Sequence, residues 1–122
     1  MGAIPTFGSI VLDCPDPAGL AGFYRALLEW DEPKVADDGH WATLVNPRGG
    51  PRLEFQRATD YRAPEWPSPE RPQQAHLDLD VADLEAAHLR VLGFGATLLD
   101  DSPKTFRVYA DPAGHPFCLC AC

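Results

Sequence analysis

The pattern of apolar and polar positions divides the N-terminal part of the chain into a strand, a helix and two further strands. The segment "FGSIVLDC" predicts a strand, after which Asp16 caps a helix that has Pro17 in its first turn. "HWATLVN" and "RLEFQRA" then predict two strands joined by the turn "NPRGGP". The apolar residues of the helix share one face, which we expect to pack on a sheet: Leu20, Phe23, Tyr24, Leu27 and Leu28.

The same order of elements begins again in the C-terminal part of the chain. "QAHLDLDV" predicts a strand, and Asp83 caps a second helix. The strands "TFRVYA" and "FCLCAC" follow, joined by the turn "DPAGHP". The second helix repeats the apolar spacing of the first, with Leu84, Ala87, His88, Val91 and Leu92. Each half thus predicts a strand, a helix and then two or three strands. Two such βαβββ-like units in succession indicate a duplicated domain rather than a long repeat array.

A proline-rich segment separates the two halves. Four prolines fall between Pro64 and Pro72, which excludes an ordinary helix or a central strand there. We therefore predict one α+β domain spanning residues 1–122. It would consist of two βαβββ modules, at about 4–62 and 73–121, joined by a linker at 63–72.

The paired units carry a family resemblance. "IVLDCPDPAGLAGFYRALLEW" opens the first unit, "AHLDLDVADLEAAHLRVLGFGATLL" opens the second, and "DPAGHPFCL" closes the chain. In this order they resemble the vicinal oxygen chelate superfamily, and within it the glyoxalase-like and bleomycin-resistance-like proteins. The resemblance covers nearly the whole chain. It implies the glyoxalase/bleomycin resistance/dihydroxybiphenyl dioxygenase fold, with sheets that curve round a cleft, usually in a homodimer.

The resemblance also implies where a catalytic metal would be held. Metal-dependent members take two ligands from each module, one on its first strand and one on its last. The first-strand positions are Ser9 and His76, each seven residues before its helix cap. The last-strand positions are Glu54 and Cys118, each four residues after the last glycine of the preceding turn. Histidine or glutamate-type ligands are implied at all four, so Ser9 and Cys118 depart from the set.

These departures favour a site without a metal cofactor. Cys118 would then be a small buried apolar residue, as free cysteines commonly are. The alternative is a divalent metal such as zinc or nickel held by Glu54, His76 and Cys118, since zinc accepts oxygen, nitrogen and thiolate ligands together. Without a metal, His76 and Glu54 are candidates for a general acid and base, or His76 simply forms hydrogen bonds in a polar pocket.

Strand alternation suggests which other residues face the presumed cleft. Trp41, Thr43 and Gln56 alternate toward it, and with Ser9 and Cys118 they form the predicted ligand-binding set. Other polar and aromatic groups have two interpretations each. Asp78 and Asp80 share the strand face of His76, but we expect them in water at strand ends. Trp66 would be either a lid over the pocket or a packing anchor at a dimer interface.

Composition and charge narrow the classes of partner. The net charge is −8 with no cluster of Lys or Arg, which makes nucleic acid an unsuitable partner and suits a neutral or cationic small molecule. There is no long apolar run and no secretory signal, so we expect a cytoplasmic protein away from membranes. The four cysteines are then expected to be reduced thiols.

Three functions remain open on the sequence. The first is small-molecule binding in a cleft between the modules, without a catalytic metal. The second is a metal-dependent lyase or isomerase of the glyoxalase kind, or a relative from the dioxygenase superfamily. The third is a metal-independent enzyme that uses His76 and Glu54 as acid and base. The expected partners are a small-molecule ligand and a second copy of the chain.

Overall fold

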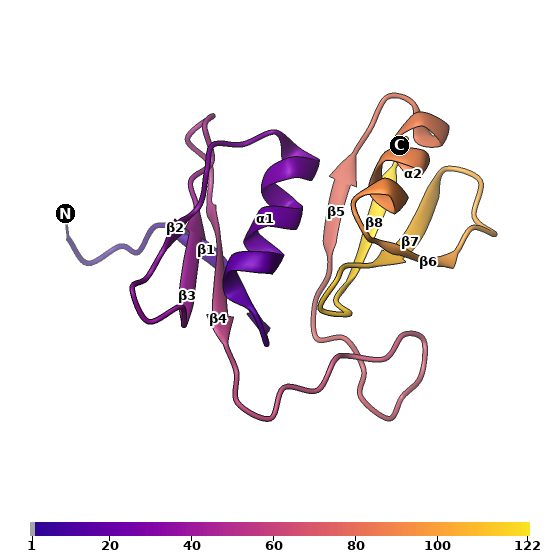
Figure 1. Ribbon diagram of the computed structural model, residues 1–122. Coiled ribbons are helices and arrows are strands. Elements are labelled where there is room, and N and C mark those ends of the chain that lie inside the picture. The colour runs from indigo at the N-terminus through magenta and orange to yellow at the C-terminus, as the bar shows by residue number, and fades with distance from the viewer. Residues whose placement is uncertain (1) are drawn as a thin grey trace. The chain divides into compact units, whose positions relative to one another are not determined.

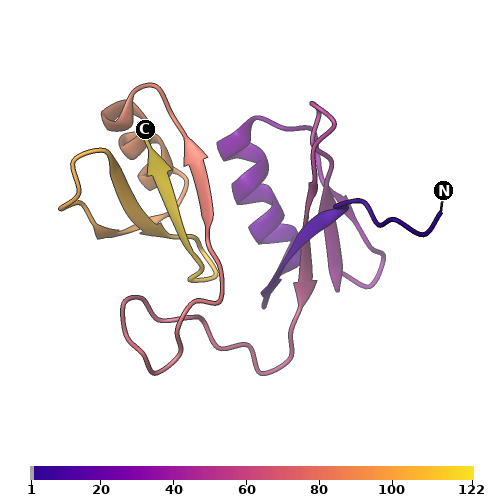
Figure 2. The ribbon, with the colours of Figure 1, turned by 180° about the vertical axis from the view of Figure 1, so that it is seen from behind.

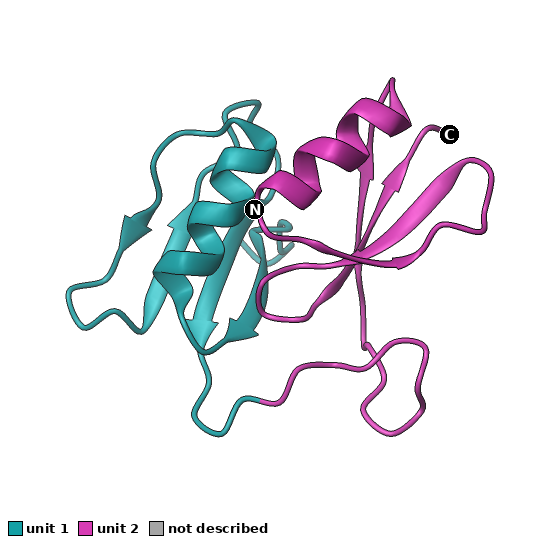
Figure 3. Ribbon diagram, turned by 45° about the vertical axis from the view of Figure 1, so that its right-hand side comes forward, with its two compact units in different colours: residues 1–61 teal, residues 62–122 magenta. Residues whose placement is uncertain are grey.

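The computed structural model describes residues 2–122, which form two compact units. The first extends to Tyr61, and the second comprises Arg62–Cys122 (Figure 3). Each contains one helix and a four-stranded mixed sheet. The predicted α+β fold with two βαβββ units is therefore confirmed.

In the first unit the sheet has the strand order β1-β4-β3-β2 (Figure 1). Its elements are β1 (Ser9–Cys14), α1 (Pro17–Leu28), β2 (Lys34–Val35), β3 (Trp41–Leu44) and β4 (Arg52–Arg57). β1 runs parallel to β4 and the other pairs are antiparallel, so the first and last strands of the unit are neighbours. The two-residue β2 lies between the helix and "HWATLVN", in a segment for which no strand was predicted.

The helix α1 forms where the sequence predicts it, because its N-terminal cap and its apolar face both indicate a helix over these residues. The Asp16 side chain accepts a hydrogen bond from the backbone N–H of Gly19, and Pro17 is at the first helical position. Of the predicted face, Leu20, Phe23, Tyr24 and Leu27 are buried. The Tyr24 ring stacks on Phe55 of β4, with ring centroids 5.9 Å apart. The helix is thus held on the sheet by apolar contact.

The second unit repeats this topology, with the strand order β5-β8-β7-β6 (Figure 2). Its elements are β5 (Leu77–Asp80), α2 (Leu84–Gly93), β6 (Thr97–Asp100), β7 (Phe106–Ala110) and β8 (Pro116–Cys120). β5 runs parallel to β8, as β1 does to β4. The rings of Tyr109 and Phe117 stack in the core with centroids 5.5 Å apart, and the Tyr109 hydroxyl hydrogen-bonds to Nδ1 of His88 at 2.8 Å.

The proline-rich segment at 63–72 belongs to the second unit. Within it, the Glu65 backbone N–H donates to the Arg71 carbonyl oxygen, and the Arg71 guanidinium lies 3.1 Å from the Glu65 carboxylate. Arg71 Nε also donates to the carbonyl oxygen of Ala63. These contacts close the segment into a loop. Among residues 2–122, no helix has the length and apolarity to cross a bilayer.

Candidate functional site

The first unit gathers polar side chains around Glu54 on β4. Thr43 lies opposite Glu54 on the neighbouring strand β3, and its hydroxyl donates to Glu54 Oε1 at 3.0 Å. Trp41, two residues earlier on the same strand face, donates from Nε1 to the same oxygen at 3.3 Å. Ser9 at the start of β1 also hydrogen-bonds to this carboxylate. Strand alternation thus brings Ser9, Trp41 and Thr43 to Glu54.

These contacts hold Glu54 in its ionised form. The hydrogen bond from Ser9 is the largest influence that lowers the pKa of Glu54 below its usual value of 4.5, and burial opposes it. Hydrogen bonds from Thr43 and Trp41 and the charge of Arg52, whose Nε lies 4.0 Å from Oε1, lower the pKa further. Glu54 is therefore a carboxylate at neutral pH, with much of its acceptor capacity already used within its own unit.

The lowered pKa of Glu54 predicts an acid-sensitive contribution to stability. A carboxyl group whose pKa is lower in the folded chain than in the unfolded chain stabilises the fold at pH values above its unfolded pKa. This contribution is lost as the pH falls through the folded pKa. Glu54→Gln should therefore flatten the decrease in the free energy of unfolding below about pH 4.5. Urea titrations at several pH values would measure this. Glu32→Gln, which changes an exposed carboxylate in an ion pair with Arg25, is the control and should keep the wild-type slope. Equal slopes for wild type and Glu54→Gln would contradict the prediction.

The second unit contains a cavity of about 370 Å³. This size lies at the lower end of the range of small-molecule sites. Trp66 and Gln73 reach the cavity from the proline-rich loop and the residues after it, and His76 lies immediately before β5. The rest of the lining comes from β5, β7, β8 and the chain end. The complete lining is Trp66, Gln73, His76, Asp78, Phe106, Val108, Pro116, Cys118, Cys120 and Cys122.

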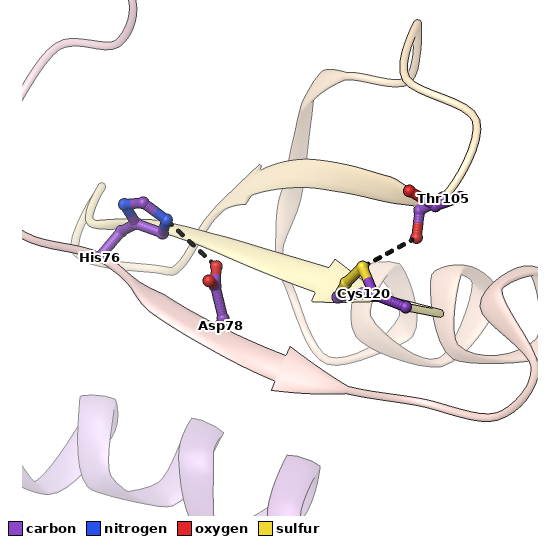
Figure 4. The surroundings of a disulfide bond; sticks show 5 residues. His76, Asp78, Thr105 and Cys120 are labelled. Carbon is purple, nitrogen blue, oxygen red and sulfur yellow. Dashed lines mark hydrogen bonds and ion pairs between the residues drawn. A yellow bond between two sulfur atoms is a disulfide. The ribbon is translucent and has the colours of Figure 1, made fainter.

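Three groups with metal-ligand or acid–base chemistry meet in this cavity. His76 Nε2 lies 3.1 Å from Asp78 Oδ1, and Figure 4 shows the imidazole directed at the carboxylate. Asp78 is opposite Cys118 in the ladder between β5 and β8. One ligand atom from each of His76, Asp78 and Cys118 lies within 4.8 Å of the others. The pairing of a first strand with a last strand therefore assembles this group.

The Cys118 thiol is held neutral. Burial is the largest influence that raises its pKa to about 11, followed by the negative charge of Asp78 and the hydrogen bond between the thiol and that carboxylate. Asp78 thus accepts from Cys118 while it lies beside His76. A protonated, buried thiol is a poor nucleophile at neutral pH, so Cys118 is inert unless Asp78 or the solvation changes.

The end of the chain places two more sulfur atoms at the cavity. Cys120 and Cys122 form a disulfide, and Figure 4 shows the bond beyond the end of β8. The expectation of four reduced thiols is therefore wrong for this pair. After β8 the chain stays beside residue 105, because Ala121 N–H donates to the Thr105 carbonyl oxygen, and this brings Cys122 back to Cys120. In the described part of the chain, Cys14 and Cys118 are the cysteines outside this disulfide.

Comparison with known proteins identifies the family. The model of the glyoxalase-like domain matches residues 9–120. The chain belongs to the glyoxalase-like domain family. No curated protein matches it.

Solved structures share the glyoxalase-like fold. A possible glyoxalase from Bacillus cereus is 12% identical with a TM-score of 0.70, and the match covers 97% of this chain and 100% of that one. A glyoxalase/bleomycin resistance protein/dioxygenase family enzyme from Burkholderia phytofirmans is 13% identical with a TM-score of 0.72, covering 94% and 97%. A glyoxalase/dioxygenase from Nostoc punctiforme is 20% identical with a TM-score of 0.66, covering 97% and 91%. At these identities the likeness shows the fold, and the predicted resemblance to glyoxalase-like proteins is confirmed by the family model.

The residues of this glyoxalase-like chain do not fit the four-ligand metal site that its family resemblance implies. Ser9 offers a neutral hydroxyl, and it is already bonded to Glu54. Cys118 is a neutral thiol whose pKa of about 11 must be overcome before it can bind as a thiolate. The Glu54 carboxylate accepts from three side chains of its own unit. His76 is then the one implied ligand whose side chain is typical of such sites and is not in conflict with the contacts it makes.

The glyoxalase-like structure divides the predicted site residues between its two units. Ser9, Trp41, Thr43 and Glu54 come together in the first, while His76 and Cys118 come together in the second. Gln56 is exposed and lies opposite Trp41 in the pairing of β3 with β4. That both groups share one cleft, and that Glu54 acts with His76, stay predictions.

Sequence reasoning missed residues that line the cavity of the glyoxalase-like chain. Asp78 is exposed, as expected, but it also contacts His76 and Cys118, which was not expected. Its position two residues after His76 on the same strand face was the available signal. Gln73 also lines the cavity, and its Oε1 is a buried acceptor without a hydrogen-bond partner. No periodicity in the proline-rich region could have indicated it.

Proposed function

We propose that this glyoxalase-like protein binds a small molecule in the cavity of its second unit and does so without a resident catalytic metal. The observation that carries this is the combination of an apolar lining with two polar acceptor groups. Trp66, Phe106 and Val108 supply apolar surface, Asp78 supplies a carboxylate, and the buried Gln73 Oε1 is an acceptor without a partner. Apolar pockets with a few convergent polar groups are typical ligand sites.

The chemistry of the lining favours a ligand with an apolar or aromatic body and a cationic donor group. Asp78 contributes a carboxylate, and Gln73 Oε1 needs a donor that the described residues do not supply. The net charge of −8 also favours a positively charged ligand. A protonated amine on an aromatic or alicyclic body would satisfy both acceptors. A carboxylate of similar shape would be repelled by Asp78.

A matched ligand series tests this proposal. Aromatic amines, the corresponding alcohols and the corresponding carboxylates would be screened by thermal shift and by ligand-observed NMR, with EDTA present. We expect saturable binding of amines, weakened about tenfold or more by Asp78→Asn, since loss of a charged hydrogen-bond partner costs about 1.5–3 kcal/mol. Asp80→Asn is the matched control, because Asp80 lies on the same strand and does not line the cavity.

Two results would contradict the proposal. One is equal weakening by Asp80→Asn and Asp78→Asn, which would assign the preference to general surface charge. The other is undiminished binding in Val108→Trp, a variant that fills the cavity from β7. Binding that disappears with EDTA would instead support a metal-dependent protein.

The contact between His76 and Asp78 favours a second candidate function, a metal-independent enzyme with His76 as general acid or base. A carboxylate 3.1 Å from the imidazole can orient the ring for proton transfer. The carboxylate partner within the unit is Asp78, in place of the predicted Glu54. Chemical conversion of a bound ligand that is lost in His76→Gln and persists with EDTA would favour this candidate over binding alone.

A further inference from the structure

Three cysteine sulfur atoms lie at one cavity. The small-molecule binding proposed above involves only one of them, Cys118, through its hydrogen bond to Asp78. Cys118 and Cys120 are two residues apart and lie on the same face of β8, and Cys122 follows the end of that strand. All three line the cavity together with His76. Cys14, the remaining cysteine, is buried in the first unit, where its thiol lies 3.8 Å from the Gln56 carbonyl oxygen. The clustering is therefore local to the end of the second unit.

We propose that Cys120 and Cys122 form a redox-controlled chelating pair for a soft, thiophilic cation, with Cys118 as the third sulfur. The disulfide shows that the chain after β8 can bring both Sγ atoms to one place. After reduction the same backbone presents two thiols at adjoining positions of one cavity. Soft cations such as Cu(I) and Cd(II) prefer thiolate ligands, whereas Mg(II) and Mn(II) prefer oxygen.

Reduction of the Cys120–Cys122 disulfide comes before cation binding. A dithiol reductant donates two electrons and two protons to the Cys120–Cys122 disulfide and itself becomes a disulfide. A cation then binds the two reduced sulfurs and releases their two protons. The reverse exchange, with a disulfide as the two-electron oxidant, re-forms the Cys120–Cys122 bond, removes both donors and releases the cation. The exposure of Cys122 and partial exposure of Cys120 give a reductant access to the bond.

This site differs from the four positions that the family resemblance implies. Two of its donors, Cys120 and Cys122, lie outside that set, and the set's oxygen ligand Glu54 is not needed. The proposal is also independent of amine binding, because it requires the sulfurs and not Asp78 or Gln73. A protein that binds no amine could still bind a soft cation, and the reverse also holds.

A cadmium titration tests the proposal. Protein reduced with a phosphine, with excess reductant removed under argon, would be titrated with Cd(II) and followed by the sulfur-to-cadmium charge-transfer absorbance. We expect one Cd(II) per chain, and no such band in the protein whose Cys120–Cys122 disulfide is intact. In Cys120→Ser/Cys122→Ser the affinity should fall at least about 100-fold, the upper end of what loss of an outer partner of a metal ligand costs. Cys118→Ser should weaken binding less.

The controls separate this site from other thiol sites. Cys14→Ala removes a thiol elsewhere and should leave the titration unchanged. Alkylation with iodoacetamide, read by mass spectrometry, gives a second measurement on the unmodified chain: Cd(II) should protect Cys120 and Cys122. The proposal is overturned if reduced protein binds no Cd(II). It is also overturned if binding survives in Cys120→Ser/Cys122→Ser and is lost in Cys118→Ser, because the ion would then lie on His76, Asp78 and Cys118.

Discussion

Replacement of Gly114 by alanine should lower the free energy of unfolding by about 2–5 kcal/mol. Gly114 has a φ of +91°, a left-handed backbone conformation that costs an L-residue about 1–2 kcal/mol. A Cβ at this position would also lie 2.6 Å from the Cβ of Ala63, which is too close for two carbon atoms. Overpacking of this kind costs about 1–3 kcal/mol more. Denaturant unfolding would measure the sum.

Gly95→Ala is the matched control for Gly114→Ala. Gly95 lies in the same unit with a φ of +106°, but a Cβ there would meet no atom within 4 Å. Its substitution should cost only the conformational part, about 1–2 kcal/mol. Adding Ala63→Gly to Gly114→Ala should recover the steric part, and a double-mutant cycle would give a coupling energy of about 1–3 kcal/mol. A coupling energy of zero would contradict this, because it would show that the loop containing Ala63 moves away from the new Cβ without any loss of stability.

The second large effect is expected at Asp111, the buried carboxylate of the same turn. Asp111 is 4% exposed, and its Oδ1 accepts from the backbone N–H groups of Ala113 at 2.9 Å and His115 at 3.0 Å. Asp111→Ala leaves both donors without this partner, at about 1–3 kcal/mol for each buried group. We therefore expect a loss of about 2–6 kcal/mol in the free energy of unfolding.

Asp111→Asn separates the hydrogen bonds from the charge. Both bonds converge on Oδ1, so an amide oxygen in the same place can keep them. The asparagine variant should lose only about 1 kcal/mol, the difference between a charged and a neutral acceptor. If Asn and Ala destabilise equally, the carboxylate acts through its charge and not through the two bonds. Chemical denaturation at neutral pH would distinguish these results.

The elements of this fold could be predicted because local signals agreed with the final packing. Asp16 and Asp83 both cap helices, as their positions before apolar stripes indicate. The second helix fits its stripe less well: Val91 is buried, but Leu92 remains 37% exposed. Its periodicity indicates the helix correctly, while the extent of burial depends on the partner surface, which the spacing does not describe.

The candidate site could be predicted only in part, because it depends on pairing between distant segments. Alternation correctly placed Trp41 and Thr43 beside Glu54. The role of Asp78 depends on its register opposite Cys118, and no local pattern sets that register. The disulfide depends on where the chain turns after β8, and the contribution of Gln73 depends on a loop without periodicity. These are tertiary properties, so sequence spacing did not reveal them.

The parallel pairing of first and last strands has a consequence for how each unit forms. In the first unit residue 9 lies opposite residue 52, and in the second residue 77 lies opposite residue 117. Because β4 and β8 are inner strands, each sheet stays in two pieces until its last strand enters between the others. Such distant pairings slow folding. The ends of a long segment must come together, at a cost in chain entropy, before any stabilising contact forms between them. The strand that contributes Cys118 and Cys120 to the cavity is thus the strand on which completion of its sheet depends, and the cavity cannot exist in a partly folded unit.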